Sequence, residues 1–131
     1  MNGSEPDPKR VLDASALLAL LFGEVGFEVV QLEGSAVSAV NWSEVIQVAA
    51  RRDADVAGLA DAIAAEGAVV VPFTAAQAES AAALWTRTRA AGLSLADRAC
   101  LALAQQYGVP ALTADQAWGD VDAGVEVVVV L

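Results

Sequence analysis

Four acidic side chains, in four separate segments of the chain, have the type and placement expected of a hard-metal site. Each lies where an apolar stretch passes into a segment of helical character; they are Asp13, Glu44, Asp97 and Asp115. If the strands are parallel, these carboxylates should meet at one edge of the sheet, because ligands bind at the carboxyl ends of parallel strands. Two like charges ~4 Å apart repel by about 4 kcal/mol at an effective dielectric near 20. A bound divalent cation is therefore the natural explanation for such a cluster.

The composition leaves little other chemistry. The 131 residues include no histidine and one cysteine, which excludes Ser-His-Asp and Cys-His catalysis and nearly every zinc site. Carboxylates, hydroxyls and seven Lys or Arg side chains remain, and such a set favours oxygen-bound Mg²⁺ or Mn²⁺. Cys100 lies in an apolar run and is predicted to be a small packed hydrophobe. Because no disulfide can form within the chain, we expect a reducing, cytoplasmic location.

Each of the four acids also has a purely structural interpretation as a helix cap. Asp13 and Asp115 could be ordinary N-caps. The spacings Asn41-x-x-Glu44 and Ser94-x-x-Asp97 both fit a capping box, in which the third helical residue bonds back to the cap. Capping is the simpler interpretation of any one of them taken alone, and only the joint pattern indicates a site.

The order of apolar runs and Ala/Leu-rich segments predicts how these residues are positioned. The alternation is typical of an α/β fold of three layers (α/β/α), with a mostly parallel sheet of about five strands and six to seven helices. We expect strands near residues 10–12, 36–38, 69–71, 111–113 and 125–131, and helices near 15–22, 25–32, 41–52, 54–65, 74–91 and 94–107. Residues 1–9 are interpreted as a flexible N-terminal tail and residues 10–131 as a single domain. The longest apolar run near the start is too short to span a membrane.

The net charge of −10 taken alone argues against a nucleic-acid partner, because phosphate binding draws on Lys and Arg. The objection weakens if bound cations offset the four clustered carboxylates. The acidity also suits a basic protein partner.

Four segments, in order along the chain, resemble the motifs of the PIN-domain family, and specifically of VapC-like toxins of type II toxin–antitoxin systems. They are Val11-Leu12-Asp13-Ala14-Ser15, Asn41-Trp42-Ser43-Glu44-Val45, Leu93-Ser94-Leu95-Ala96-Asp97 with the helical run that follows, and Leu112-Thr113-Ala114-Asp115-Gln116-Ala117-Trp118. No single segment is specific, but four in order at family-like spacing cover nearly everything from Val11 to Leu131. Arg98 departs from the pattern, since a small residue is common there, and its direction is left open between the site and the opposite side.

The resemblance implies a metal-dependent endoribonuclease that cleaves RNA phosphodiester bonds with a carboxylate-bound Mg²⁺ or Mn²⁺. Asp13, Asp97 and Asp115 would be the principal metal ligands, and Glu44 would bind metal or position water. For the hydroxyls of Ser15 and Thr113, orienting a ligand and plain capping remain equally open. Asp120 and Asp122 lie in a Gly/Asp-rich turn, where solvated loop acids are the expected interpretation, although Asp120 could reach the rim of the site.

The resemblance also implies partners, namely a cognate antitoxin and a second copy of the chain in a homodimer. Trp42, Trp85 and Trp118 are candidate interface anchors, but Trp85 has the helical spacing of a core or dimer contact. Two other functions remain as alternatives. One is a catalytically silent PIN-like module that only binds a partner. The other is a haloacid-dehalogenase-like phosphatase, which the Ser at position 15 disfavours because that family uses an Asp-x-Asp pair.

Overall fold

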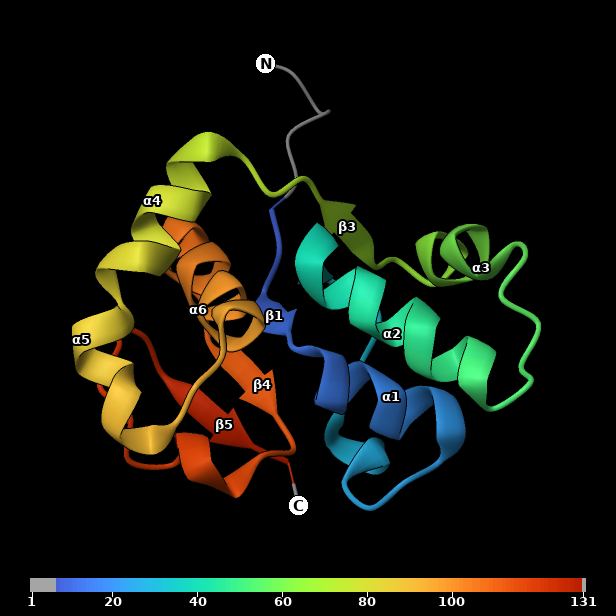
Figure 1. Cartoon of the computed structure of the whole chain (residues 1–131). Helices are drawn as coiled ribbons and strands as arrows, with labels where there is room; N and C mark the ends of the chain where they lie inside the picture. The colour runs from blue at the N-terminus through green and yellow to red at the C-terminus, as the bar shows by residue number, and fades with distance from the viewer. Residues whose placement is uncertain (1–6, 131) are drawn as a thin grey trace.

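The structure is a computed structural model that describes residues 7–130. Residues 1–6 of the expected N-terminal tail therefore lie outside the described residues. Five short strands form one sheet in the order β3-β2-β1-β4-β5, and every neighbouring pair is parallel (Figure 1). The strands are β1 (Arg10–Leu12), β2 (Ser35–Ser38), β3 (Val69–Val71), β4 (Ala111–Thr113) and β5 (Val127–Val129).

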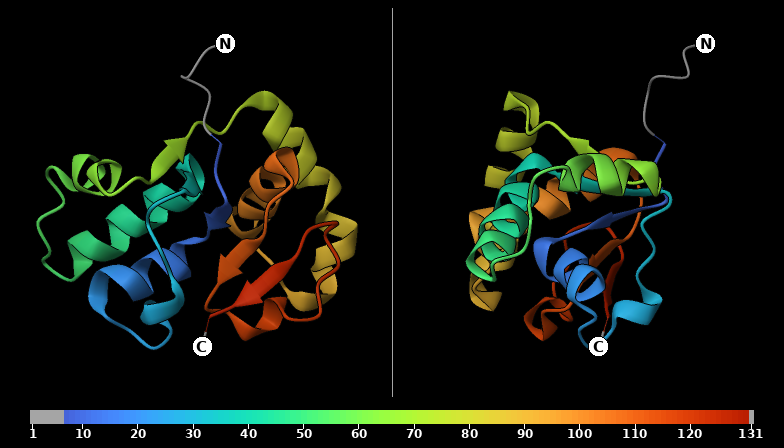
Figure 2. Two further views of the ribbon diagram at one scale, coloured as in Figure 1. Left: turned by 180° about the vertical axis from the view of Figure 1, so that it is seen from behind. Right: turned by 90° about the vertical axis from the view of Figure 1, so that its right-hand side faces the viewer.

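In the described part of the chain, six α-helices and three 3₁₀ turns connect the strands. The helices are α1 (Ala14–Phe22), α2 (Ala39–Arg51), α3 (Leu59–Ala65), α4 (Ala75–Ala83), α5 (Trp85–Thr88) and α6 (Leu95–Tyr107). The 3₁₀ turns are η1 (Phe27–Val29), η2 (Arg89–Ala91) and η3 (Gln116–Trp118). Figures 1 and 2 show α1–α3 gathered on one side of the molecule and α4–α6 on the other. Among residues 7–130, no helix has the length and apolar character needed to cross a bilayer.

Different helices cover the two faces of the sheet. Each strand contributes side chains to both faces, because successive side chains of a strand point in opposite directions. In the central strand β1, Val11 packs in a buried cluster with residues of α4 and α6, whereas Leu12 packs with residues of α1 and α2. Strand β4 repeats the division, with Ala111 in the first cluster and Leu112 in the second. The predicted three-layer α/β/α fold with a five-stranded parallel sheet is therefore confirmed.

Three predicted elements are shorter than expected, and the single helix expected over 74–91 is divided into α4, α5 and η2. The helix expected over 25–32 is only the turn η1, which follows Gly26 at φ 94°, and the helix expected over 54–65 is only α3, which follows Gly58 at φ 79°. Such positive φ values lie in the left-handed region and interrupt a right-handed helix. The strand expected over 125–131 covers only β5, where all three valines are half-buried, because β5 is an edge strand.

Candidate active site

Two of the four carboxylates come from the ends of neighbouring strands. Asp13 directly follows β1, and Asp115 lies two residues beyond the end of β4. The strands pair in parallel with Leu12 opposite Leu112, and the backbone N–H of Asp13 donates to the carbonyl of Leu112 at 3.0 Å. Both carboxylates therefore leave the sheet at the same edge, as parallel pairing requires.

The other two carboxylates are carried by helices that pack on each other. Asp97 is the third residue of α6 and Glu44 is the sixth residue of α2. Together with Asp13 and Asp115 they line one cleft of about 230 Å³, whose other lining residues are Ala14, Ser15, Leu18 and Val48. The structure thus brings together all four carboxylates that the sequence singles out.

Asp13 is the most constrained of the four, with only 4 % of its surface exposed. Its Oδ1 accepts hydrogen bonds from the Ser15 hydroxyl at 2.7 Å and from the Ala16 backbone N–H at 2.8 Å. Its Oδ2 accepts a hydrogen bond of 2.5 Å from the Thr113 hydroxyl. The Thr113 oxygen in turn accepts the backbone N–H of Asp115 at 3.0 Å. The hydroxyls of Ser15 and Thr113 thus orient the carboxylate of Asp13 rather than only capping a helix.

Burial raises the pKa of Asp13 from 3.8 to about 6, because removal from water disfavours the charged carboxylate. The hydrogen bonds from Thr113, Ala16 and Ser15 act in the opposite direction, and the nearby negative charge of Asp97 raises the pKa further. No Lys or Arg forms an ion pair with any of the four carboxylates in residues 7–130, where the one ion pair joins Arg52 to Glu24. The cleft therefore holds negative charge that these residues leave uncompensated.

An oxygen-only donor set with uncompensated negative charge fits a hard divalent cation such as Mg²⁺ or Mn²⁺. In the present arrangement, however, no three acidic, histidine or cysteine side chains within residues 7–130 are grouped closely enough to hold an ion. Glu44 and Asp115 are exposed at the mouth of the cleft, whereas Asp13 is buried. Like charges in one cleft repel, which favours this separation of the carboxylates when no cation lies between them.

Three of the four carboxylates also take part in helix capping. Asp13 is the N-cap of α1, Asp115 is the N-cap of η3, and Asp97 forms a capping box with Ser94. The capping box expected for Asn41 and Glu44 is wrong. Helix α2 begins earlier, at Ala39, and its N-cap is Ser38, whose hydroxyl accepts the backbone N–H of Val40.

Asn41 is a residue of the site that the sequence did not identify correctly. It lies inside α2, is 1 % exposed, and donates hydrogen bonds to Glu44 Oε1 at 3.2 Å and to the Ala96 carbonyl at 3.0 Å. The available signal was its spacing of three residues from Glu44, which is also the spacing of neighbours on one helix face.

The remaining candidates lie outside the cleft lining. The Arg98 guanidinium donates to the Ala81 carbonyl of α4 at 2.9 Å, which settles its direction away from the carboxylates. Asp120 and Asp122 are exposed, and Asp122 accepts the Gly124 backbone N–H. Cys100 is fully buried, and burial together with the nearby carboxylates raises the pKa of its thiol, as expected of a packed neutral side chain.

The three tryptophans have different environments. Trp118 is fully buried in the cluster formed with α4 and α6, and Trp42 packs partly buried against the other cluster. Trp85 is 49 % exposed, and the Arg89 guanidinium lies 4.9 Å from the centre of one of its rings. Only Trp85 therefore presents a large exposed surface to a partner.

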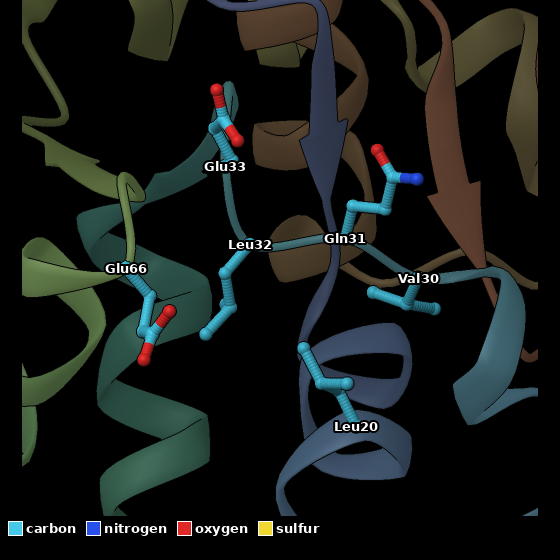
Figure 3. Close-up of a pocket in the computed structure, with 6 residues that line it drawn as sticks. All are labelled: Leu20, Val30, Gln31, Leu32, Glu33 and Glu66. Atoms are coloured by element: carbon cyan, nitrogen blue, oxygen red, sulfur yellow. The ribbon is translucent and has the colours of Figure 1, made fainter.

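A larger hollow, of about 410 Å³, involves none of the four acids (Figure 3). It is lined by Leu20, Val30, Gln31, Leu32, Glu33 and Glu66. The carboxylates of Glu33 and Glu66 point in different directions in Figure 3, so they do not converge on one point. The acidic cleft is consequently the stronger candidate for chemistry.

Comparison with known proteins gives a family and a fold. The family model of the PIN domain matches residues 10–124. A toxin–antitoxin complex from Klebsiella pneumoniae has a similar structure, with a TM-score of 0.71 and 20 % identity over 93 % of this chain and 98 % of that one. The toxin VapC20 of Mycobacterium tuberculosis, described as cleaving the sarcin–ricin loop, has a TM-score of 0.65 and 19 % identity over 87 % and 97 %. DNA-bound VapBC from Salmonella typhimurium has a TM-score of 0.66 and 15 % identity over 92 % and 96 %. The search of curated proteins gave no match.

Proposed function

This chain belongs to the PIN-domain family, and from that membership we propose that it is a metal-dependent endoribonuclease that acts as the toxin of a toxin–antitoxin pair. The observation that carries the proposal is the single cleft lined by Asp13, Glu44, Asp97 and Asp115. A site made of carboxylates alone, without histidine or a reactive cysteine, suits phosphodiester hydrolysis assisted by a cation.

Asp13, Asp97 and Asp115 would hold a Mg²⁺ or Mn²⁺ ion, with Glu44 completing the site or positioning water. A bound divalent cation would lower the pKa of a water molecule and offset charge that develops on the phosphate. Asp13 is fixed by the hydroxyls of Ser15 and Thr113, so its oxygens keep one orientation. The carboxylate of Glu44 is exposed, and it would act on a water at the cleft by taking its proton during attack on phosphorus.

The solved structures of similar fold supply the biological context of the proposal. One is a toxin described as cleaving the sarcin–ricin loop, and others are toxins in complex with antitoxins. By analogy, the partners of this chain are an RNA substrate, a cognate antitoxin and a second copy of itself in a homodimer, all within the cytoplasm. Exposed apolar side chains and a net charge of −10 suit a basic, amphipathic antitoxin. Within residues 7–130, the large apolar residues that are exposed are Val25, Phe27, Val29, Val69, Trp85 and Leu95.

The direct test is RNA cleavage by the purified chain with Mg²⁺ or Mn²⁺ and with EDTA. We expect cleavage only with the metal, and we expect Asp97→Asn to lower its rate at least a hundredfold because one ligand charge is lost. Asp61→Asn is the matched control, since this carboxylate is exposed on α3 and outside the cleft. Mapping new RNA 5′ ends after induced expression of the wild type and Asp97→Asn would identify the substrate.

Equal cleavage by the wild type and Asp97→Asn would refute the proposal. Absence of cleavage of any RNA with either metal, combined with tight binding of a protein partner, would instead favour the catalytically silent binding module.

A further inference from the structure

We propose that Asn41 is a positioning residue that sets the separation of Glu44 and Asp97 across the cleft, an inference that rests on the function proposed above. Its side-chain amide donates one hydrogen bond to Glu44 Oε1 at 3.2 Å and another to the carbonyl of Ala96 at 3.0 Å. Ala96 directly precedes Asp97 in the first turn of α6. One amide group therefore links the carboxylate on α2 to the backbone that carries the carboxylate on α6.

Glu44 depends on this contact more than the other acids depend on theirs. Asp13, Asp97 and Asp115 each accept a hydrogen bond from a backbone N–H, which fixes them to the local chain. Glu44 is exposed and, in the part of the chain that the structure describes, its only hydrogen-bond donor is Asn41. Without that donor, a glutamate with three rotatable bonds would sample many positions at the mouth of the cleft.

The unpaired amide oxygen of Asn41 indicates that this residue does more than stabilise the fold. Asn41 is 1 % exposed, and its Oδ1 is buried without a hydrogen-bond partner among the described residues. An unpaired buried amide oxygen is unfavourable. An apolar residue at this position would avoid that cost, but it would not donate to Glu44 and to Ala96. The two donated hydrogen bonds are thus the feature that distinguishes Asn41 from an ordinary core residue.

The chain contains a close structural counterpart with no link to the cleft. Gln77 is the third residue of α4, as Asn41 is the third residue of α2. It is 4 % exposed, donates to Gln106 of α6 at 2.9 Å, and also leaves its amide oxygen buried and unpaired. If both residues merely tie a helix to α6, replacing either one by alanine should have the same consequences.

The test compares Asn41→Ala and Gln77→Ala in the full chain by binding of Mn²⁺, followed through the electron paramagnetic resonance signal of the free ion. We expect Asn41→Ala to weaken Mn²⁺ binding about tenfold, as loss of a group that orients a metal ligand typically does. Gln77→Ala should stay within about twofold of the wild type. Both variants should lower the melting temperature by a few degrees, because each loses buried hydrogen bonds.

Three further measurements distinguish a positioning role of Asn41 from a general loss of stability. In the cleavage assay, the Mn²⁺ concentration for half-maximal rate should rise about tenfold in Asn41→Ala, while the rate at saturating Mn²⁺ recovers most of the wild-type value. In a Glu44→Gln background, Asn41→Ala should weaken Mn²⁺ binding much less, because the ligand that it positions has already lost its charge. Asn41→Ser, which keeps one donor, should lose less affinity than Asn41→Ala.

Equal behaviour of Asn41→Ala and Gln77→Ala would overturn the inference, and so would full, additive effects of Asn41→Ala in the Glu44→Gln background. If both Asn41 variants unfold while Gln77→Ala folds, Asn41 is a folding residue and the inference is again overturned. Failure of the proposed function looks different, because the wild type itself would then bind no Mn²⁺ or would cleave no RNA. In that case the inference falls with the function.

Discussion

Asp13→Asn should make the folded protein more stable at neutral pH, although it should abolish the proposed activity. The carboxylate of Asp13 is 4 % exposed, has no cationic partner within residues 7–130, and has its pKa raised from 3.8 to about 6. Each pKa unit corresponds to about 1.4 kcal/mol, so at pH 8 the charge of Asp13 costs about 3 kcal/mol of unfolding free energy. The uncharged amide of Asn removes this cost.

Part of the gain is offset by rearranged hydrogen bonds. Asn Oδ1 can still accept from Ser15 and from the Ala16 N–H, but its NH₂ group faces the Thr113 hydroxyl, which now donates to Asp13. Turning that hydroxyl costs about 1 kcal/mol, which leaves a net gain of about 2 kcal/mol. For a domain of this size, such a gain raises the melting temperature by about 7 °C.

The assay is urea unfolding of the wild type and Asp13→Asn from pH 8 to pH 4. Since the folded-state pKa of Asp13 lies above the unfolded value, the folded protein binds the proton more tightly, and wild-type stability rises as the pH falls through 6 toward 4. The charge-related advantage of the variant should therefore shrink to roughly half by pH 5 and to about a fifth by pH 4. Asp120→Asn makes the same change in net charge at an exposed position, and it should shift stability by less than about 0.5 kcal/mol.

Lower stability of Asp13→Asn than of the wild type at pH 8 would refute this reasoning, because the hydrogen bonds to the carboxylate would then outweigh its burial. A stability difference that does not change with pH would refute it as well. Millimolar Mg²⁺ offers a separate check, since a cation in the cleft should stabilise the wild type and leave Asp13→Asn unchanged.

Two further predictions concern the fold, each with a matched control. Gly67→Ala should destabilise the protein by about 3 kcal/mol in urea unfolding, because a Cβ at φ 93° would lie 3.1 Å from the Glu33 backbone. Gly23→Ala, at φ 64° with open space around the added Cβ, should cost only about 1 kcal/mol, and equal costs would contradict the proposed clash. Trp118→Ala should cost about 3 to 5 kcal/mol because the side chain is fully buried, whereas Trp85→Ala, at a half-exposed position, should change stability by less than about 1 kcal/mol.

The order and type of the main elements could be predicted because hydrophobic pattern and local signals agree. The valine run of β3, the short apolar stretches of β1 and β4 and the Ala/Leu-rich stretch of α6 agree in local preference and in hydrophobic pattern. The failure at 25–32 has a physical cause. The sequence predicts a helix there, but Val25 is 75 % exposed and Val29 is 59 % exposed, so these apolar side chains supply no buried face to stabilise one. An apolar side chain on the surface cannot be distinguished from a core residue by periodicity alone.

The gathering of the four acids could also be predicted, since parallel strands place their carboxyl ends at one edge. The hydrogen bonds that orient these acids could not be predicted from the sequence. The hydrogen bond between Asp13 and Thr113 joins residues far apart in the chain. It forms because β1 and β4 are neighbours in the sheet, with Leu12 opposite Leu112. Asn41 was misjudged for a simpler reason, because Ser38 and Asn41 are both good N-caps and the sequence does not decide which one begins α2.

That choice of cap has consequences for the site. If Asn41 were the N-cap of α2, its side chain would accept a backbone N–H. The Glu44 carboxylate would then accept the backbone N–H of Asn41, as the Asp97 carboxylate accepts that of Ser94. Because α2 begins at Ala39 instead, Glu44 is the one carboxylate of the cleft without a backbone donor among residues 7–130, and the amide of Asn41 bridges it to α6. Capping and the proposed catalytic role are therefore not competing explanations of these acids. A backbone N–H that caps a helix also holds Asp13, Asp97 and Asp115 in place, and at the fourth position a side-chain amide replaces it.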